Sequence, residues 1–256
     1  MHEKKLIVFD LDGTLAESKT VMDAEMATLV RKLLTIKKVA VMSGGRFEQF
    51  KIEFLGSLHG SETLLRSLYL FPTCATSFYR YEKEWVHVYH EKFSEHEKGK
   101  ILLAFKQIME KNVVFQPTTL FGDVLEDRDS QITYSAAGQK APVEVKRAWD
   151  SDAKKRLVMK KMLDDLLPEF EVRIGGMTSI DVTRKGIDKG YGIWQIERVL
   201  KIPRNRMLFI GDALFPGGND FPVKVAGVEC IPVQGPEDTK KILRNMLHTN
   251  TRMVTA

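Results

Sequence analysis

Cysteine is scarce in this chain, which carries only Cys74 and Cys230 among its 256 residues. The two lie far apart in sequence and lack the short spacing of metal-binding cysteines, which argues against a disulfide framework and against a cysteine zinc site. We therefore expect two reduced thiols in a cytoplasmic protein. Long apolar runs are also missing, so the sequence predicts no membrane span, and we expect no secretory signal.

Dense runs of one charge are absent as well. The 39 basic and 34 acidic residues are spread along the chain and leave a formal net charge of +5. A nucleic-acid-binding protein would need a clustered basic face with interleaved aromatic residues, so we expect no nucleic-acid partner. A mild positive excess suits an enzyme for small anions. The length allows one large domain or two small ones, each with its own core.

The strongest motif that is present is Asp10-Leu11-Asp12-Gly13-Thr14, which directly follows the apolar run Leu6–Phe9. A short continuous apolar run is typical of a strand that is buried on both faces of a parallel sheet. Two carboxylates two residues apart in an extended segment point the same way and repel each other. Such a pair needs a cation, a shared proton or a bound electrophile, so we expect chemistry here. The alternative is that Asp10 caps a turn and Asp12 is solvated.

Strand-like and helix-like segments alternate at both ends of the chain, which predicts an α/β fold with a parallel sheet. In the middle, the alternating polar and apolar residues from Tyr79 to His90 and from Ser130 to Ala136 are typical of antiparallel strands. Ser94 and Glu97 have capping-box spacing before a helix predicted to end near Lys111. We therefore predict one α/β domain, residues 1–80 and 186–256, interrupted by an α+β domain at 81–185.

Polar residues follow several of the predicted parallel strands. They are Asp10, Asp12, Ser43, Lys189, Asp212 and Asp220. Ligands of open parallel sheets bind beyond the carboxyl ends of the strands, so these side chains should converge. Carboxylates suit Mg²⁺, and a hydroxyl, a lysine and a metal together can hold a transferring phosphoryl group. Taken singly, Ser43 could be a helix N-cap, Lys189 a solvated lysine and Asp212 a turn cap.

This set of motifs resembles the haloacid dehalogenase (HAD) phosphotransferase superfamily, which implies a Rossmann-like core with an inserted cap. The resemblance implies that Asp10 is the nucleophile and that Asp12 is the general acid and base. Ser43 and Lys189 match the second and third motifs. The resemblance also implies Mg²⁺ as the cofactor, bound by the residues Asp10, Asp12 (through its backbone carbonyl), Asp212 and Asp220.

Two longer stretches, Ile174–Val182 and Gly211–Asp220, are similar to eukaryotic-type phosphomannomutases, in which the cap is α+β. The resemblance implies a small phosphorylated sugar as substrate and a possible homodimer through the cap. It implies that Ser179 and Asp181 bind sugar hydroxyls. The other implied substrate-binding positions are Lys19, Gly44, Arg46, Arg128, Gln139, and Lys146 or Arg147. The basic residues in this set could equally be solvated surface charges.

Two positions depart from the phosphomannomutase pattern. Gln139 stands where that family has a phosphate-binding arginine, so a bidentate, charge-assisted contact is lost. Ser43-Gly44-Gly45-Arg46 is closer to the second motif of capped sugar phosphatases. The sequence therefore favours a Mg²⁺-dependent sugar phosphatase that works through phospho-Asp10, with a phosphomannomutase as the alternative. A catalytically silent sugar-phosphate binding module is a further alternative, against which the complete set of motifs argues.

Overall fold

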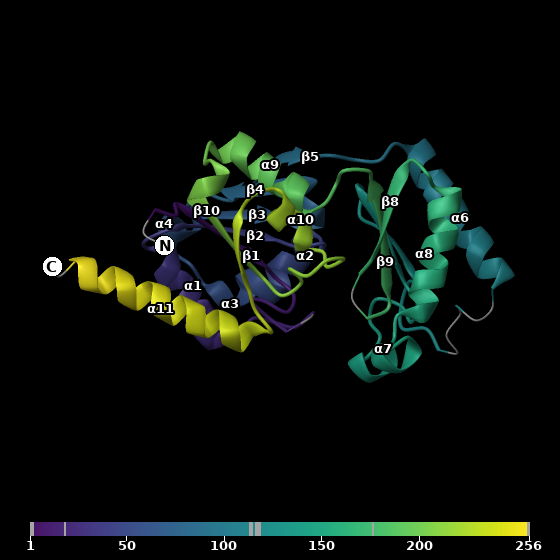
Figure 1. Ribbon diagram of the computed structural model, residues 1–256, viewed down its shortest axis with the longest axis horizontal. Helices are drawn as coiled ribbons and strands as arrows, with labels where there is room; N and C mark the ends of the chain where they lie inside the picture. The colour runs from purple at the N-terminus through teal and green to yellow at the C-terminus, as the bar shows by residue number, and fades with distance from the viewer. Residues whose placement is uncertain (1–2, 18, 113–114, 116–118, 176, 255–256) are drawn as a thin grey trace. The chain divides into compact units, whose positions relative to one another are not determined.

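The computed structural model describes residues 3–17, 19–112, 115, 119–175 and 177–254, and its chain divides into two compact units (Figure 1). The core unit contains residues 1–90 and 188–256, and the cap unit contains residues 91–187. The cap begins later than the predicted residue 81. Strand β5 (Trp85–His90) pairs with β4 (Ser77–Tyr81), which itself pairs with the core strand β3 (Leu68–Phe71). The hairpin therefore belongs to the core.

The core has the predicted α/β class and is built on one seven-stranded sheet in the order β11-β10-β1-β2-β3-β4-β5. Its remaining strands are β1 (Leu6–Asp10), β2 (Lys38–Met42), β10 (Met207–Gly211) and β11 (Glu229–Pro232). The five strands from β11 to β3 are parallel to one another. Strand β4 pairs antiparallel with β3, and β5 pairs antiparallel with β4. Every residue of β1 is buried, which explains why this strand is an unbroken apolar run until Asp10.

Helices cover both faces of the core sheet. They are α1 (Ala24–Leu34), α2 (Phe47–Gln49), the π-helix η1 (Phe50–Leu55), α3 (Gly56–Leu58), α4 (Glu62–Leu65), α5 (Pro72–Ala75), α9 (Lys189–Leu200), the 3₁₀ turn η3 (Arg204–Arg206), α10 (Phe221–Val225) and α11 (Pro236–Val254). Helices α1, α3 and α11 lie on one side of the sheet and α9 and α10 on the other (Figure 1). The central strand β1 contributes to both apolar layers, because its side chains alternate between the two faces.

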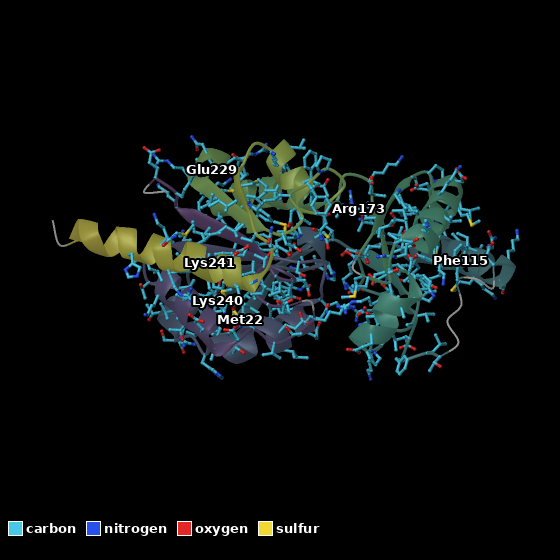
Figure 2. The ribbon with its side chains drawn as sticks, turned by 60° about the horizontal axis from the view of Figure 1, so that its bottom comes forward. Met22, Phe115, Arg173, Glu229, Lys240 and Lys241 are labelled. Carbon is cyan, nitrogen blue, oxygen red and sulfur yellow. The ribbon has the colours of Figure 1, made fainter. Side chains whose placement is uncertain are left out.

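Helix α11 is tied to the start of α1 by ion pairs. Nζ of Lys240, which is labelled in Figure 2, lies 2.8 Å from the carboxylate of Asp23, the N-cap residue of α1. Lys240 is 5% exposed, whereas the adjacent Lys241 is exposed and pairs with Asp238. No helix among the described residues is long and apolar enough to cross a membrane.

The cap is a four-stranded antiparallel sheet in the order β6-β7-β9-β8, with helices packed on one face. Its elements are α6 (Glu95–Lys111), β6 (Leu125–Asp127), β7 (Gln131–Ser135), α7 (Val143–Trp149), α8 (Lys154–Leu166), β8 (Phe170–Ile174) and β9 (Ser179–Arg184). Apolar side chains of β7, β8 and β9 pack with those of α6 and α8 in a single core. The hydroxyl of Tyr134 donates to the carbonyl oxygen of Phe115, labelled in Figure 2, at 2.9 Å.

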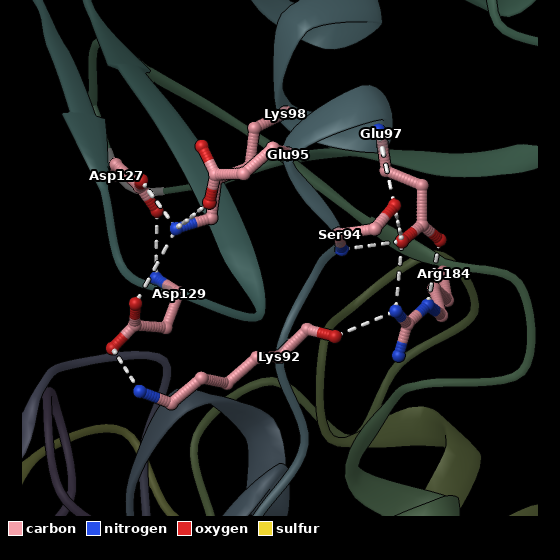
Figure 3. A network of polar contacts seen from close by, with 8 residues as sticks. All are labelled: Lys92, Ser94, Glu95, Glu97, Lys98, Asp127, Asp129 and Arg184. Atoms are coloured by element: carbon pink, nitrogen blue, oxygen red, sulfur yellow. Dashed lines mark hydrogen bonds and ion pairs between the residues drawn. The ribbon is translucent and has the colours of Figure 1, made fainter.

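The predicted capping box at Ser94 is present, and α6 ends at Lys111 as expected. Arg184 of β9 binds the glutamate of this capping box (Figure 3). It donates to both carboxylate oxygens of Glu97 at 2.8 Å and to the backbone carbonyl of Lys92 at 2.6 Å. Residues that enter the cap and residues that leave it are therefore held together at its base by one guanidinium.

Candidate active site

A buried lysine joins two carboxylates at the carboxyl end of the core sheet. Nζ of Lys189, the first residue of α9, lies 2.6 Å from Oδ1 of Asp10 and 2.5 Å from Oδ1 of Asp220. Lys189 is only 1% exposed, so it is not the solvated helix-start lysine of the alternative interpretation. Asp10 ends β1 and Asp220 precedes α10, so three segments distant in sequence meet at this point.

The charge at this site is not balanced. One carboxylate oxygen from each of Asp10, Asp212 and Asp220 lies within 4.8 Å of the others. Three carboxylates against the single ammonium of Lys189 leave two negative charges uncompensated. Burial and the neighbouring Asp220 raise the pKa of Asp10 well above its ordinary value, although Lys189 opposes this. A divalent cation with oxygen ligands fits both the donor atoms and the missing charge.

The same excess of charge affects the other two partners. The side chain of Asp212 is exposed, but partial desolvation and the charge of Asp220 raise its pKa. Burial alone would lower the pKa of Lys189, but the charges of Asp10 and Asp220 outweigh it and raise that pKa. Lys189 therefore stays protonated, because losing its proton would leave the buried carboxylates without a counter-charge.

Two glycines allow the carboxylates to approach the strand ends. Gly13 has φ of +78°, and a Cβ placed on it would lie 2.5 Å from Oδ2 of Asp212. A Cβ on Gly211, the last residue of β10, would lie 2.3 Å from Oδ2 of Asp220. Any larger residue would push a carboxylate out of the cluster, and at Gly13 it would also adopt a strained backbone conformation.

Asp12 lies outside the lysine pair and is half-buried. Its Oδ1 accepts a hydrogen bond from the backbone N–H of Lys19 at 2.7 Å. The side chain of Lys19 is exposed, so the structure assigns its backbone to the orientation of Asp12.

Ser43 follows β2, the strand next to β1, and is buried. Its Oγ accepts from the N–H of Gly45 at 3.1 Å, while the N-cap position of α2 is occupied by Arg46. Ser43 is therefore not the helix cap of the alternative interpretation. Gly44, Gly45 and Arg46 continue this turn, so the second motif forms one short loop beside the Asp10 strand end.

This loop is supported by strained, left-handed backbone within the short element α5 itself. Thr73, Cys74 and Ala75 have φ of +50°, +54° and +66°. The N–H of Thr73 donates to the carbonyl of Gly45 at 2.9 Å, and the N–H of Cys74 donates to that of Ser43 at 3.0 Å. Left-handed backbone in three consecutive non-glycine residues costs free energy and persists where it holds a functional loop.

The cap carries a second set of the predicted residues on one face of its sheet. Backbone register places Asp181 on β9 between Thr133 on β7 and Arg173 on β8. Ser179 lies opposite Ser135, and their hydroxyls are 3.1 Å apart. We call this surface the polar face of the cap sheet. Its residues are Glu126, Gln131, Thr133, Ser135, Glu171, Arg173, Ser179, Asp181 and Thr183.

The predicted cap cations occupy different settings. Arg128 is buried and donates twice to Oε2 of Glu126, at 3.0 and 2.7 Å. Lys146 and Arg147 lie on α7, where Lys146 is half-buried and Arg147 is exposed. Gln139 donates from Nε2 to Oγ of Ser135 at 3.0 Å, so it contacts the serine pair. Gly176 of the stretch Ile174–Val182 lies outside the described residues.

Sequence reasoning missed Gln131 and Thr133. Gln131 donates from Nε2 to Oγ1 of Thr133 at 2.9 Å, and Thr133 contacts Oδ1 of Asp181 at 2.7 Å. The signal was the alternation of polar and apolar residues along β7, which places Gln131, Thr133 and Ser135 on one face. Alternation alone does not tell a polar binding face from a solvated one.

The comparisons with known proteins identify the family of the chain. A family profile described as eukaryotic phosphomannomutase matches residues 26–249. The chain belongs to the eukaryotic phosphomannomutase family. It is 27% identical over 248 residues to a phosphomannomutase of Encephalitozoon cuniculi, covering 93% of this chain and 91% of that protein. It is 24% identical to human phosphomannomutase 1, covering 97% of this chain and 94% of that protein.

The solved structures show the fold. A haloacid dehalogenase-like hydrolase from Bacteroides thetaiotaomicron superposes with a TM-score of 0.64 at 14% identity, covering 95% of this chain and 99% of that one. The phosphomannomutase family and the HAD-like neighbours confirm the predicted resemblance, and they indicate an enzyme of the HAD phosphotransferase kind.

Proposed function

We propose that this protein is a Mg²⁺-dependent phosphomannomutase that interconverts mannose 1-phosphate and mannose 6-phosphate through phospho-Asp10. The match of the phosphomannomutase family across most of the chain carries the proposal. The phosphatase that the sequence favours is less well supported, because the curated relatives are named as mutases. Mutase chemistry was the predicted alternative.

The core residues suit nucleophilic phosphoryl transfer. A carboxylate oxygen of Asp10 would attack the phosphorus of the sugar phosphate, and the bond from phosphorus to the sugar oxygen would break. Lys189 lies 2.6 Å from Asp10 and can offset the negative charge of the transferring group. Mg²⁺, held by Asp10, Asp212, Asp220 and the backbone carbonyl of Asp12, would supply further charge compensation.

Asp12 would carry the proton in both directions. It would protonate the departing sugar oxygen when phospho-Asp10 forms, and it would take the proton of the attacking sugar hydroxyl when phospho-Asp10 is used. Starting from phospho-Asp10, mannose 1-phosphate would become the 1,6-bisphosphate. Transfer of its other phosphoryl group back to Asp10 would then release mannose 6-phosphate, so a trace of bisphosphate would start the cycle.

The polar face of the cap sheet would bind the part of the sugar that is not reacting. Ser179 and Asp181 would hold hydroxyls, while Arg128, Arg46 and the basic residues Lys19, Lys146 and Arg147 are the candidate partners of the second phosphate. Exposed Leu102 and Leu103 on α6, with exposed Leu157 and Val158 on α8, support a homodimer through the cap.

A sugar phosphatase is the second candidate, and Gln139 is the observation that favours it. A mutase must hold its substrate in two orientations and return the phosphoryl group before water takes it, whereas a phosphatase needs one orientation. The neutral amide of Gln139 cannot make the bidentate contact of an arginine. Phosphate held less firmly in the cap would favour transfer to water.

Phosphorus NMR separates the two candidates. The protein is mixed with mannose 1-phosphate, Mg²⁺ and catalytic hexose 1,6-bisphosphate. Conversion to the 6-phosphate ester with little inorganic phosphate is the result we expect. Dominant inorganic phosphate would replace the mutase by the phosphatase. No reaction, together with failure to form a beryllium fluoride complex at Asp10, would leave a sugar-phosphate binding module.

A further inference from the structure

Gln131 is buried on the polar face of the cap sheet, and the oxygen of its side-chain amide has no hydrogen-bond partner among the described residues. Its side chain is 0% exposed. Nε2 lies 2.9 Å from Oγ1 of Thr133, but Oε1 has no hydrogen-bond partner among the described residues. Buried side-chain oxygens are almost always paired, so an unpaired one needs an explanation.

The orientation of this amide follows from Asp181. The hydroxyl of Thr133 donates to Oδ1 of Asp181 at 2.7 Å, which uses its single proton. Thr133 can then only accept from Gln131, which requires the amide nitrogen on that side. Flipping the amide would place Oε1 against a hydroxyl with no proton to donate. Oε1 is therefore directed away from Thr133 as a free acceptor.

We call the chain of hydrogen bonds from Gln131 through Thr133 to Asp181 a relay. A second relay of the same kind lies beside it. Gln139 donates from Nε2 to Oγ of Ser135 at 3.0 Å, and Ser135 contacts Oγ of Ser179 at 3.1 Å. In both relays a glutamine amide sets a hydroxyl on β7, and that hydroxyl contacts a residue of β9. The β9 residues are Asp181 and Ser179, the two positions proposed to bind sugar hydroxyls.

We propose that Gln131 is a specificity-determining substrate contact. Its Oε1 accepts a hydrogen bond from one hydroxyl of the sugar phosphate, while its Nε2 positions Asp181 through Thr133. This inference rests on the proposed function, because it assigns a contact within the same sugar site. The hydroxyl supplies the donor that Oε1 lacks in the free protein, so sugars without it leave a buried acceptor unpaired.

Gln131→Met tests the contact because methionine keeps the length of the side chain and removes the amide. Gln107→Met on α6 is the matched control. The probes are mannose 1-phosphate and its 2-, 3- and 4-deoxy analogues, and kcat and KM are measured for each. We expect wild-type kcat/KM to fall about tenfold or more for one analogue. In Gln131→Met that analogue and the parent sugar should be used about equally well.

Stability separates a substrate contact from a structural role. If Gln131 served only to stabilise the fold, its replacement would destabilise the ligand-free protein, so Gln131→Met would lower Tm. If Gln131 is a substrate contact, we expect Tm without ligand to be unchanged or raised in Gln131→Met, because an unpaired buried oxygen is removed. We also expect mannose 1-phosphate to raise Tm less in Gln131→Met than in the wild type. If Gln131→Met does not fold, Gln131→Leu and the relay variant Thr133→Val take its place. Thr133→Val should weaken the hydroxyl preference and raise KM, because the amide of Gln131 and the carboxylate of Asp181 both lose the partner that orients them.

The outcomes distinguish this inference from the proposed function. Wild-type turnover with the same preference among deoxy sugars in Gln131→Met overturns the inference alone, as does a lowered Tm with unchanged kinetics. Absence of turnover and binding of every sugar phosphate in the wild-type protein overturns the proposed function and the inference with it. Turnover of another hexose phosphate overturns only the choice of mannose, and the same comparison is then made with deoxy analogues of that hexose.

Discussion

Nζ of Lys189 lies 2.6 Å from Oδ1 of Asp10, although the two residues are 179 positions apart in the chain. If Asp10 is the nucleophile, Asp10→Asn should reduce phosphoryl transfer by about a thousandfold or more. The fold should remain, since Lys189 keeps Asp220 and a carboxylate with a raised pKa is removed from a buried site. Phosphorus NMR and circular dichroism check both parts.

The matched control for Asp10→Asn is Asp152→Asn, which changes an exposed carboxylate paired with Lys154 in the cap. Its activity should equal that of the wild type. Residual activity above about a tenth in Asp10→Asn would rule out Asp10 as the nucleophile.

Lys189→Met should destabilise the core by about 3–5 kcal/mol, because two buried carboxylates lose their counter-charge. Urea unfolding of the variant measures the loss. Lys241→Met, which removes an exposed lysine paired with Asp238, should cost less than about 0.5 kcal/mol. Asp10→Asn combined with Lys189→Met should recover part of the stability. Equal losses at Lys189 and Lys241 would contradict the buried pair.

Mg²⁺ should stabilise the protein, since it supplies the two positive charges that the carboxylate cluster lacks. At a concentration about 100-fold above Kd, binding adds about 2.7 kcal/mol to the free energy of unfolding. Thermal unfolding with Mg²⁺ and with chelator measures this. Asp212→Asn should abolish most of the gain without damaging the fold, because Asp212 is exposed and outside the two lysine contacts. An equal rise of Tm in the variant would place the cation elsewhere.

Gln139→Arg should shift the products toward the mutase reaction. A guanidinium can bind phosphate through two charge-assisted hydrogen bonds, so the intermediate should stay bound longer and lose less phosphate to water. We expect the ratio of mannose 6-phosphate to inorganic phosphate to rise several-fold. Gln139→Lys adds a positive charge but not the two parallel hydrogen-bond donors of a guanidinium, so it should give a smaller rise in this ratio. An unchanged ratio in both variants would mean that position 139 does not contact phosphate.

The Arg184–Glu97 pair should stabilise the cap in a pH-dependent way. Hydrogen bonds from Arg184 lower the pKa of Glu97 from 4.5 to about 2. Its contribution is therefore full above about pH 4.5 and is lost as the pH falls toward 2. Because the Arg184 side chain is 40% exposed, we expect only about 0.5–1 kcal/mol from Glu97→Gln at pH 7.

Chemical unfolding at pH 7 and at pH 3 measures how that difference shrinks. Glu95→Gln, two residues earlier in the first turn of α6 and 94% exposed, should have little effect at either pH. A loss in Glu97→Gln that is the same at both pH values would show that Glu97 acts through packing rather than charge.

Local patterns in the sequence predicted local structure well. The apolar run before Asp10 is β1, and the spacing of Ser94 and Glu97 is the capping box of α6. The capping box needs only contacts within four residues, and a strand that is buried on both faces shows as an apolar run. The cluster of Asp10, Lys189 and Asp220 was also foreseen, because the ends of parallel strands meet at one edge.

Long-range partners were harder to predict. The alternation from Tyr79 to His90 indicates a strand pair, but it does not say that β4 joins β3 of the core rather than the cap sheet. Residues 47–55 form α2 followed by the π-helix η1, and the spacing of hydrophobic residues does not distinguish an α-helix from a π-helix. Gln131 was missed because its role depends on which neighbour takes the proton of Thr133.

The position of β1 between β2 and β10 constrains how the chain is made. During synthesis β1 can pair with β2 early. Its other neighbour, Met207–Gly211, lies about two hundred residues after β1 and emerges only after the entire cap. Until then one edge of this fully buried strand has no partner and can pair with other chains. Shortened products ending before residue 207 would keep this open edge and would also lack Asp212 and Asp220. Nascent chains of this protein should therefore depend on chaperones until Met207–Gly211 has been translated.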